Sequence, residues 1–568
     1  MNPDNLFRSE VVKIVSKATK FPEKEIESLL EKPRDPKLGD LSLPCFKLSR
    51  KSIEDPKEIA VDIGKTPPAG LVKDIWVAGP YVNFYADWKK VGEVVIREIL
   101  KQKEKYGRSD YGKGRKVMVE YSAPNTNKPL HLGHLRNDSI GMAVSNTLQA
   151  AGFNAVRANL YSNRGIHICK SMLAYQKYGK GKKPKIKPDH FVGEYYVLYE
   201  KRKTKKLEEE LKEMLRKWEK KDPHVRALWK KMDTWAIKGF RETYKRFGSV
   251  FDVEFRESDF YDKAKPVIET GLKKGVFKND YDGAVIADLE AEKLTKKVIR
   301  RGDGTSIYIT NDLALTPHKF STFKLGKAIW VVGSEQDLYF QQLFKILELL
   351  GYPWAKDCQH LSYGMVFLPS GKMKSREGIV VDADDIMDRM TELARKEIKQ
   401  REKKISKTEL EKRAKAIGLG ALKYFLLKMD SIKSLNFNPE ESVSFEGNTG
   451  PYIQYTHARI CSILKKGKVK QFRFDPSLLK DEREKILVRS LMDFPRVVQD
   501  AARDYKPNYV ANYIYQLANQ FNEFYEFLRV LQAEEPGMKE ARLALSRAAQ
   551  IVLKNGLNLL GIDAPERM

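Results

Sequence analysis

Apolar positions along the chain alternate with polar ones, or recur at helical spacing, and this pattern divides the sequence into three regions. Residues 1–112 open with a helical pattern and continue into the alternating segment IWVAGPYVNFYAD, residues 75–87. A charged, Gly-containing stretch, KQKEKYGRSDYGKGRK, follows at residues 101–116. These features predict a small α/β domain with a linker behind it.

The second region, residues 113–385, shows strands and helices in alternation. Its predicted elements are the strand VMVEYSAPN (117–125), the helix LRNDSIGMAVSNTLQAAG (135–152), the strand NAVRANLY (154–161), and later AIWVVG (328–333), FQQLFKILELLGY (340–352) and HLSYGMVFL (360–368). Strand, loop, helix and strand in this order predict a Rossmann-like parallel sheet. The fold class expected is therefore α/β.

Two further stretches are helical. A charged insertion at about residues 180–245 contains KRKTKKLEEELKEMLRKWEKK, which we expect to be a solvated helix with i,i+4 ion pairs and no chemistry. From residue 386 to residue 568, segments such as FNEFYEFLRVL and ALSRAAQIVLKNGLNLLGI have apolar stripes at 3.6-residue spacing. The last region is therefore predicted to be an all-α domain.

Composition favours a nucleic-acid partner. The 568 residues include 104 Lys and Arg against 76 Asp and Glu, a formal net charge of +28, and 42% of them are apolar. So basic a surface attracts polyanions, although a highly charged surface without such a partner is the alternative. The acidic residues near the N-terminus and the lack of a long apolar run predict a cytoplasmic protein with no membrane segment.

The four cysteines are too scattered to suggest a metal site. Cys45, Cys169, Cys358 and Cys461 form no CxxC pair, so we expect reduced thiols, no disulfide framework and no zinc. No other pattern along the chain suggests a metal cage, and no protein metal site is predicted.

The segment PNTNKPLHLGHLRND, residues 124–138, places His131, Gly133 and His134 between a strand and a helix. A helix N-terminus there offers N–H groups to phosphate, Gly133 lets a nucleotide approach the backbone, and two imidazoles can donate to a charged phosphorus centre. The alternative is a pair of ordinary helix-capping histidines. The strand–loop–helix setting makes the two interpretations about equal.

A second segment, FLPSGKMKSREG at residues 367–378, places Lys372 and Lys374 in a Gly- and Ser-containing loop after a strand. Lysines in such a loop suit the outer phosphates of ATP, where departing pyrophosphate gains negative charge. Taken alone, the segment is better explained as a surface turn.

Together these segments resemble the HIGH and KMSK signatures of class I aminoacyl-tRNA synthetases. The stretches EYSAPNTNKPLHLGHLR, SIYITNDLA, VVGSEQ, SFEGNTGPYIQYTHAR and LLGIDAPERM resemble the arginyl enzymes in particular, and KLGDLSLP with GPYVNFY resembles their N-terminal tRNA-binding domain. The resemblance covers nearly the whole chain. It implies that arginine reacts with ATP, accompanied by Mg²⁺, to give arginyl-adenylate, which is transferred to tRNA(Arg). We expect a monomer.

The resemblance assigns roles to individual residues. It implies catalytic roles for Lys128, His131, His134, Lys372 and Lys374; ATP binding by His131, Gly133, His134, Met365, Lys372 and Lys374; arginine binding by Glu120, Asn125, Glu257, Tyr308, Asp312 and Gln336; and tRNA binding by Tyr455, Arg459 and Met568. A guanidinium independently requires fixed carboxylates, among which Glu257 is the weaker candidate. Gln336 is expected to end the strand AIWVVGSEQ. Without the resemblance, Tyr308 and Asp312 would be interpreted as a helix start with a capping acid.

Two positions depart from the family pattern. Ser375 stands where KMSK has its second Lys, and Lys128 is expected to substitute for that charge. Asn163 stands where the family usually has Asp. Two alternatives remain: another class I synthetase, although no Cys/His zinc site or large editing insertion is present, and a non-catalytic RNA-binding relative, which the intact HLGH and both lysines disfavour.

Overall fold

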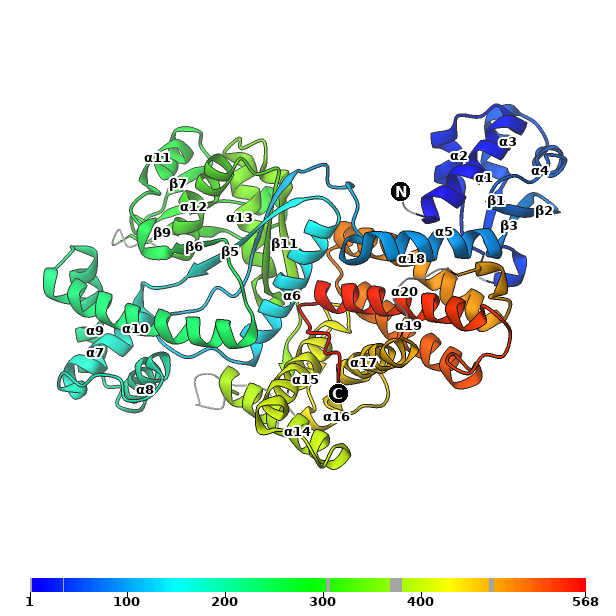
Figure 1. Cartoon of the computed structure of the whole chain (residues 1–568). Coiled ribbons are helices and arrows are strands. Elements are labelled where there is room, and N and C mark those ends of the chain that lie inside the picture. Colours follow the sequence, from blue (N-terminus) through cyan, green and yellow to red (C-terminus); the bar gives the residue numbers. More distant parts are fainter. Residues whose placement is uncertain (1–2, 34, 303–306, 368–380, 469–473) are drawn as a thin grey trace.

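The computed structural model describes residues 3–33, 35–302, 307–367, 381–468 and 474–568, and Figure 1 shows their arrangement. A small α/β part, blue in the figure, lies at one end of the molecule, and a group of helices near residues 166–247 lies at the other. A parallel sheet and a C-terminal helical part lie between them. The predicted fold class is confirmed.

An antiparallel sheet and surrounding helices form the N-terminal part. The elements are α1 (Pro3–Thr19), α2 (Glu23–Leu29), β1 (Leu41–Pro44), α3 (Phe46–Ser52), α4 (Pro56–Gly64), β2 (Val72–Ala78), β3 (Tyr81–Ala86) and α5 (Trp88–Gln102), with strand order β1–β3–β2. The alternating segment predicted at residues 75–87 is a hairpin rather than one strand. The chain reverses at Gly79, whose φ of +60° is a conformation that glycine adopts without steric cost.

The central sheet is parallel throughout. Its strands are β4 (Lys116–Glu120), β5 (Asn154–Tyr161), β6 (Val253–Arg256), β10 (Lys327–Gly333) and β11 (Cys358–Tyr363), in the order β11–β10–β4–β5–β6. The chain runs outward from β4 to β6 and returns on the other side of β4 to form β10. Ligands of open α/β sheets bind where the strand order reverses in this way. Helix α6 (Leu132–Ala150) follows β4 and begins at that edge.

The helical insertion has a core of its own. It contains α7 (Ile166–Ala174), α8 (Pro188–Lys201), α9 (Lys205–Glu219) and α10 (Pro223–Phe247). The charged helix predicted at residues 201–221 is interrupted, because Thr204 caps a new helix by accepting a hydrogen bond from Leu207 N. Nor is α9 solvated on all sides, since Leu207, Leu211, Met214 and Trp218 are buried in the insertion core.

A second, small sheet packs beside the central one. Its elements are α11 (Lys265–Lys273), β7 (Phe277–Asn279), β8 (Val285–Ala287), β9 (Lys297–Arg300), α12 (Tyr308–Phe323) and α13 (Asp337–Leu349). The strands are antiparallel in the order β7–β8–β9. Helices α12 and α13 share an apolar core with both sheets, and Lys319 of α12 contacts Glu120 at the carboxyl end of β4.

The C-terminal part is helical, as predicted, apart from a short strand pair. Its elements are β12 (Val366–Phe367), α14 (Ala383–Arg401), α15 (Lys407–Leu427), β13 (Leu435–Asn436), α16 (Pro439–Ser442), α17 (Gly450–Gly467), α18 (Glu482–Asp504), α19 (Asn508–Phe527) and α20 (Met538–Leu559). Helix α5 packs on α18 and α20 (Figure 1). Within the described ranges, no helix is long and apolar enough to span a bilayer.

Candidate functional site

The turn before α6 presents two neutral imidazoles. His131 Nδ1 accepts a hydrogen bond from Gly133 N, and His134 Nδ1 accepts one from His131 N, each at 3.1 Å. Each ring therefore has its proton on Nε2, where it remains a donor. Burial and the charge of Lys128 lower the pKa of His131 to about 3, and the pKa of His134 is lowered in the same direction, mainly by burial.

Gly133 is required by this arrangement. A Cβ atom at this position would lie 2.9 Å from the His131 ring, closer than real Cβ contacts allow. A side chain would therefore displace an imidazole as well as cover the helix N-terminus. The positive end of the α6 dipole also lies at this turn, which makes it suited to bind phosphate.

Residues on both sides of the predicted lysine loop contact α6. Leu132 N donates to Val381 O and Ala383 N donates to Leu130 O, both at 3.0 Å. On the other side, the buried Arg136 donates to Met365 O at 3.1 Å. The expected ATP ligand Met365 thus lies against the helix of the two histidines, whereas Lys372, Lys374 and Ser375 lie outside the described residues.

Arg136 was not among the predicted site residues, although it lies in the segment PNTNKPLHLGHLRND. Its guanidinium also donates to Ser431 O at 2.8 Å and to Lys433 O at 2.6 Å. It therefore joins α6 to the chain between α15 and β13. The sequence signal that could have identified it is a charged residue at a position of the helix where apolar residues are expected.

Lys128 lies close to the histidines and is largely withdrawn from solvent. Burial lowers its pKa, and among the described residues it has no carboxylate partner. With His131 it borders a cavity of about 510 Å³ against α8, where Tyr196 and His190 contribute to the opposite wall. The side chain is thus a cation that is not held by an ion pair within the described part of the chain.

Two carboxyl groups, the buried Glu257 and the partly buried Asp312, lie close enough beside the sheet edge for their charges to interact. Glu257 begins the 3₁₀ turn Glu257–Asp259 after β6, and Asp312 lies in the second turn of α12. Burial raises the pKa of Glu257 to about 7, an effect that Asp312 reinforces, and burial raises the pKa of Asp312 to about 6. An entering cation would restore both groups to the ionised form.

Neighbouring side chains hold these carboxyl groups in place. Asn311 Nδ2 donates to Glu257 Oε1 at 2.5 Å, and the Tyr339 hydroxyl donates to Asp312 Oδ2. Glu257 Oε2 is buried and has no hydrogen-bond partner in the described part of the structure. Buried polar atoms are ordinarily satisfied, so this oxygen is a natural contact for a ligand. Tyr339 was not among the predicted site residues.

Glu120 differs from these two groups because its charge is already compensated. Its Oε2 lies 2.6 Å from Lys319 Nζ, and the two side chains are 7% and 1% exposed. Lys319 comes from α12 and was not predicted. Glu257, which the sequence ranked as the weaker candidate, has no such ion pair within the described residues and keeps a buried oxygen without a hydrogen-bond partner.

The remaining predicted arginine ligands lie around the same edge. Asn125 forms an isolated bridge with Ser162 beyond the ends of β4 and β5, and Tyr308 begins α12 with about half of its surface exposed. The prediction that Gln336 ends a strand is wrong. β10 stops at Gly333, and Gln336 closes a 3₁₀ turn over Ser334–Gln336.

One group of described residues has the composition of a metal site. Ligand atoms of His190, Asp382 and Asp384 all lie within 4.8 Å of one another. Lys187 Nζ, however, lies 2.9 Å from Asp384 Oδ2, and hydrogen bonding from His190 and Lys187 helps to lower the pKa of Asp384 despite its burial. The group is therefore already an ion-pair network.

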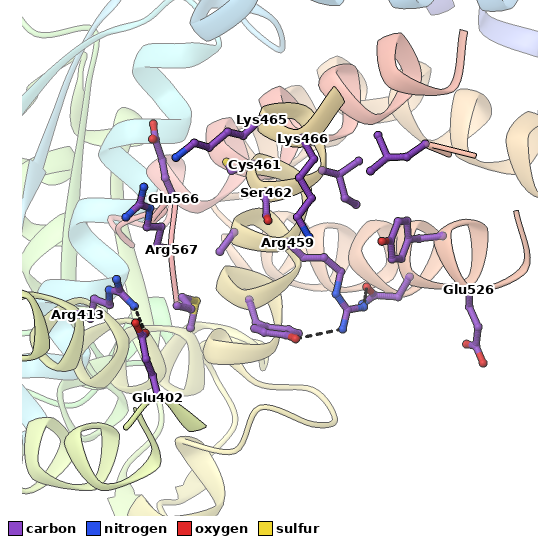
Figure 2. Close-up of a pocket in the computed structure, with 17 residues that line it drawn as sticks. Glu402, Arg413, Arg459, Cys461, Ser462, Lys465, Lys466, Glu526, Glu566 and Arg567 are labelled. Carbon is purple, nitrogen blue, oxygen red and sulfur yellow. Dashed lines mark hydrogen bonds and ion pairs between the residues drawn. The ribbon is translucent and has the colours of Figure 1, made fainter. Parts of the chain in front are cut away.

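The three predicted RNA contacts line one cavity of about 1390 Å³ in the C-terminal part, shown in Figure 2. The guanidinium of Arg459 lies 4.8 Å from the centre of the Tyr455 ring and donates to Asn522 Oδ1 at 2.8 Å. Met568 packs with Tyr455 in a small apolar cluster. Because Arg459 covers one face of the Tyr455 ring, an aromatic ligand that stacked on Tyr455 would have to use the other face or displace the guanidinium.

The last residues reach this cavity because buried side chains hold them. Gln454 Nε2 donates to Asp563 O at 2.7 Å, and His457 Nδ1 lies 2.9 Å from Pro565 O. Both side chains belong to α17, the helix of Tyr455 and Arg459. Glu566 and Arg567, which Figure 2 labels, line the same cavity.

Known protein families match consecutive parts of the chain. Residues 5–86 match the family described as arginyl tRNA synthetase N terminal domain, residues 95–438 match tRNA synthetases class I (R), catalytic domain, and residues 453–568 match the DALR anticodon binding domain. The catalytic-domain match alone spans more than half of the chain.

Individual relatives are similar to this chain over nearly its full length. An arginine–tRNA ligase of Treponema denticola is 43% identical over 95% of this chain and 94% of its own, and one of Bacteroides thetaiotaomicron is 42% identical over 96% of both. The solved arginyl-tRNA synthetase of Thermus thermophilus superposes with a TM-score of 0.80 at 26% identity, covering 99% of this chain and 100% of that one.

Proposed function

Because the chain belongs to the arginyl-tRNA synthetase family, we propose that arginine and ATP react at the carboxyl ends of β4 and β10, where the strand order reverses. The enzyme catalyses the ATP-dependent ligation of arginine to tRNA(Arg), through arginyl-adenylate. The unpaired buried carboxylate oxygen of Glu257 is the observation that favours arginine at this edge. A guanidinium is the cation that such an oxygen suits.

Arginine lies with its guanidinium between Glu257 and Asp312. Tyr308 at the start of α12 covers this end, and Asn125, Gln336 and the Lys319-bound Glu120 face the α-amino and carboxylate groups. An ion-paired Glu120 can still accept a hydrogen bond from an ammonium group through its second oxygen. The α-carboxylate is thereby directed towards the turn before α6.

ATP lies over that turn. His131 and His134 donate from Nε2 to the α-phosphate, Gly133 leaves room for the nucleotide, and Met365 lies along the adenosine. The carboxylate oxygen of arginine attacks the α-phosphorus and pyrophosphate leaves. Lys128, Lys372 and Lys374 stabilise the charge on the departing group. Mg²⁺ accompanies ATP as its counter-ion.

The tRNA is bound at several places. The unstacked middle base of the anticodon enters the cavity of Tyr455, Arg459 and Met568, and residues 1–112 contact the outer corner of the tRNA. Aromatic stacking and guanidinium contacts suit an unpaired base. Residues 113–385 act as the catalytic domain and 386–568 as the anticodon-binding domain. We propose a cytoplasmic monomer that requires no zinc.

ATP–pyrophosphate exchange with each of the twenty amino acids, with and without tRNA, tests the assignment. We expect exchange with arginine alone, and we expect it to depend on tRNA. Exchange with a different amino acid would indicate another class I specificity. A chain that binds tRNA(Arg) but supports no exchange would be a non-catalytic relative.

A further inference from the structure

A buried turn joins the helical insertion to the segment that contains Glu257. Asn163 lies between β5 and α7 and is completely buried. Its Oδ1 accepts from Ser258 N at 3.0 Å, and its Nδ2 donates to Asp233 Oδ2 at 3.3 Å. Its main-chain oxygen accepts from Trp229 Nε1 at 2.6 Å.

These contacts come from two elements, helix α10 and the turn that begins at Glu257. Trp229 and Asp233 lie one turn apart on α10, so one face of the insertion holds Asn163 at two points. Ser258 directly follows Glu257 in the 3₁₀ turn that begins there. The first N–H groups of a helical turn lack partners inside it, and the Asn163 side chain supplies one.

The next residue strengthens the same junction. Arg164 is almost fully buried, and its Nη2 lies 2.9 Å from Glu219 Oε1 on α9. Its guanidinium carbon lies 5.0 Å from the centre of the Tyr261 ring, just beyond the Glu257 turn. Two helices of the insertion therefore reach the pocket wall through residues 163 and 164.

The neighbouring carboxylate of Asp233 favours an amide over an acid at position 163 of this chain. Asp233 is 7% exposed, and its carboxylate faces the Nδ2 of Asn163. A carboxylate at position 163 would keep the acceptor for Ser258 N but would place two buried acids about as close as the amide and acid are now. Like charges at that separation cannot both remain ionised without one moving away.

We propose that Asn163, held by Trp229 and Asp233 of the helical insertion, is a positioning residue that fixes the Glu257 turn and so determines the affinity for arginine. Asn163 fixes the main chain at Ser258, whereas Asn311 fixes one carboxylate oxygen of Glu257. The other oxygen is left for the guanidinium. The inference rests on the proposed place of Glu257 in the arginine pocket.

The test is a charge swap across the Asn163–Asp233 pair. Asn163→Asp should raise the KM for arginine about tenfold or more, the scale for disturbing a buried hydrogen bond, with less than about a threefold change in the KM for ATP. Asn163→Asp/Asp233→Asn restores a carboxylate–amide pair with its donor reversed, and should return the arginine KM to within about threefold of wild type. Asn154→Asp makes the same change at the exposed start of β5 and should have no effect.

The swap and the pocket assignment can fail separately. A folded Asn163→Asp variant with a normal arginine KM, or a folded double variant that stays as impaired as the single one, overturns the positioning role. If Asn163→Asp does not fold, Trp229→Phe decides: a raised arginine KM at unchanged ATP KM supports the proposal, and an unchanged one overturns it. Glu257→Gln is measured alongside; a normal arginine KM in that variant removes the pocket assignment itself.

Discussion

The pH dependence of arginine binding tests the pocket most directly, because its carboxyl groups titrate near neutral pH. Burial and the charge of Asp312 raise the pKa of Glu257 to about 7, while the charge of Arg164 opposes them. A protonated Glu257 cannot form an ion pair with the guanidinium, which stays charged across this range. Arginine binding should therefore weaken as pH falls through 7.

The size of the effect follows from the ionised fraction. At pH 6, one unit below the pKa of Glu257, about one tenth of the groups are ionised, so the arginine KM should be about tenfold above its value at high pH. Asp312, with a pKa of about 6, adds to the rise below that point. The ATP site should not respond, because His131 has a pKa of about 3 and stays neutral throughout.

The Glu257→Gln variant distinguishes the contribution of Glu257 to the pH dependence from that of the other titratable groups. The amide keeps the shape of the side chain but removes the charge, so the pH dependence above pH 6.5 should disappear. At pH 8 the arginine KM should rise about 150-fold or more, since breaking a buried ion pair costs at least about 3 kcal/mol. ATP–pyrophosphate exchange at saturating tRNA gives both KM values. A wild-type arginine KM that is flat from pH 6 to pH 8 would refute the reasoning.

Three other predictions test the remaining assignments. Lys128→Ala should lower kcat and kcat/KM for adenylate formation together, by about a hundredfold, with little change in the ATP KM; a normal kcat would exclude the transition-state role. Tyr455→Ala and Arg459→Ala should each lower kcat/KM for tRNA by about tenfold, as loss of one stacked base predicts, and wild-type charging by either would remove the anticodon assignment. Lys319→Met leaves Glu120 buried without its cation and should lower the free energy of unfolding by about 3–5 kcal/mol in urea titrations, whereas adding Glu120→Gln should recover part of that loss.

Much of the fold was predictable because its elements have strong local patterns. The buried strand β4, the helix behind it and the next strand β5 were located from apolar periodicity and from the turn residues between them. The errors lie where local patterns are ambiguous. The strand through Gln336 ends at Gly333, and the charged stretch at 201–221 contains a helix start at Thr204, because capping and tertiary burial determine such boundaries.

For the candidate site, the sequence supplied candidate residues but not the distribution of charge among them. The sequence by itself placed His131 and His134 at the start of a helix, because strand and helix patterns flank them, whereas Glu257 and Asp312 were singled out by the family resemblance. Only the tertiary structure decided that Lys319 neutralises Glu120 and that Glu257 retains an unpaired oxygen. Those outcomes depend on which side chains 50 to 200 positions apart come together when the sheet and its helices pack, and a pairing between distant residues leaves no periodic trace in the sequence.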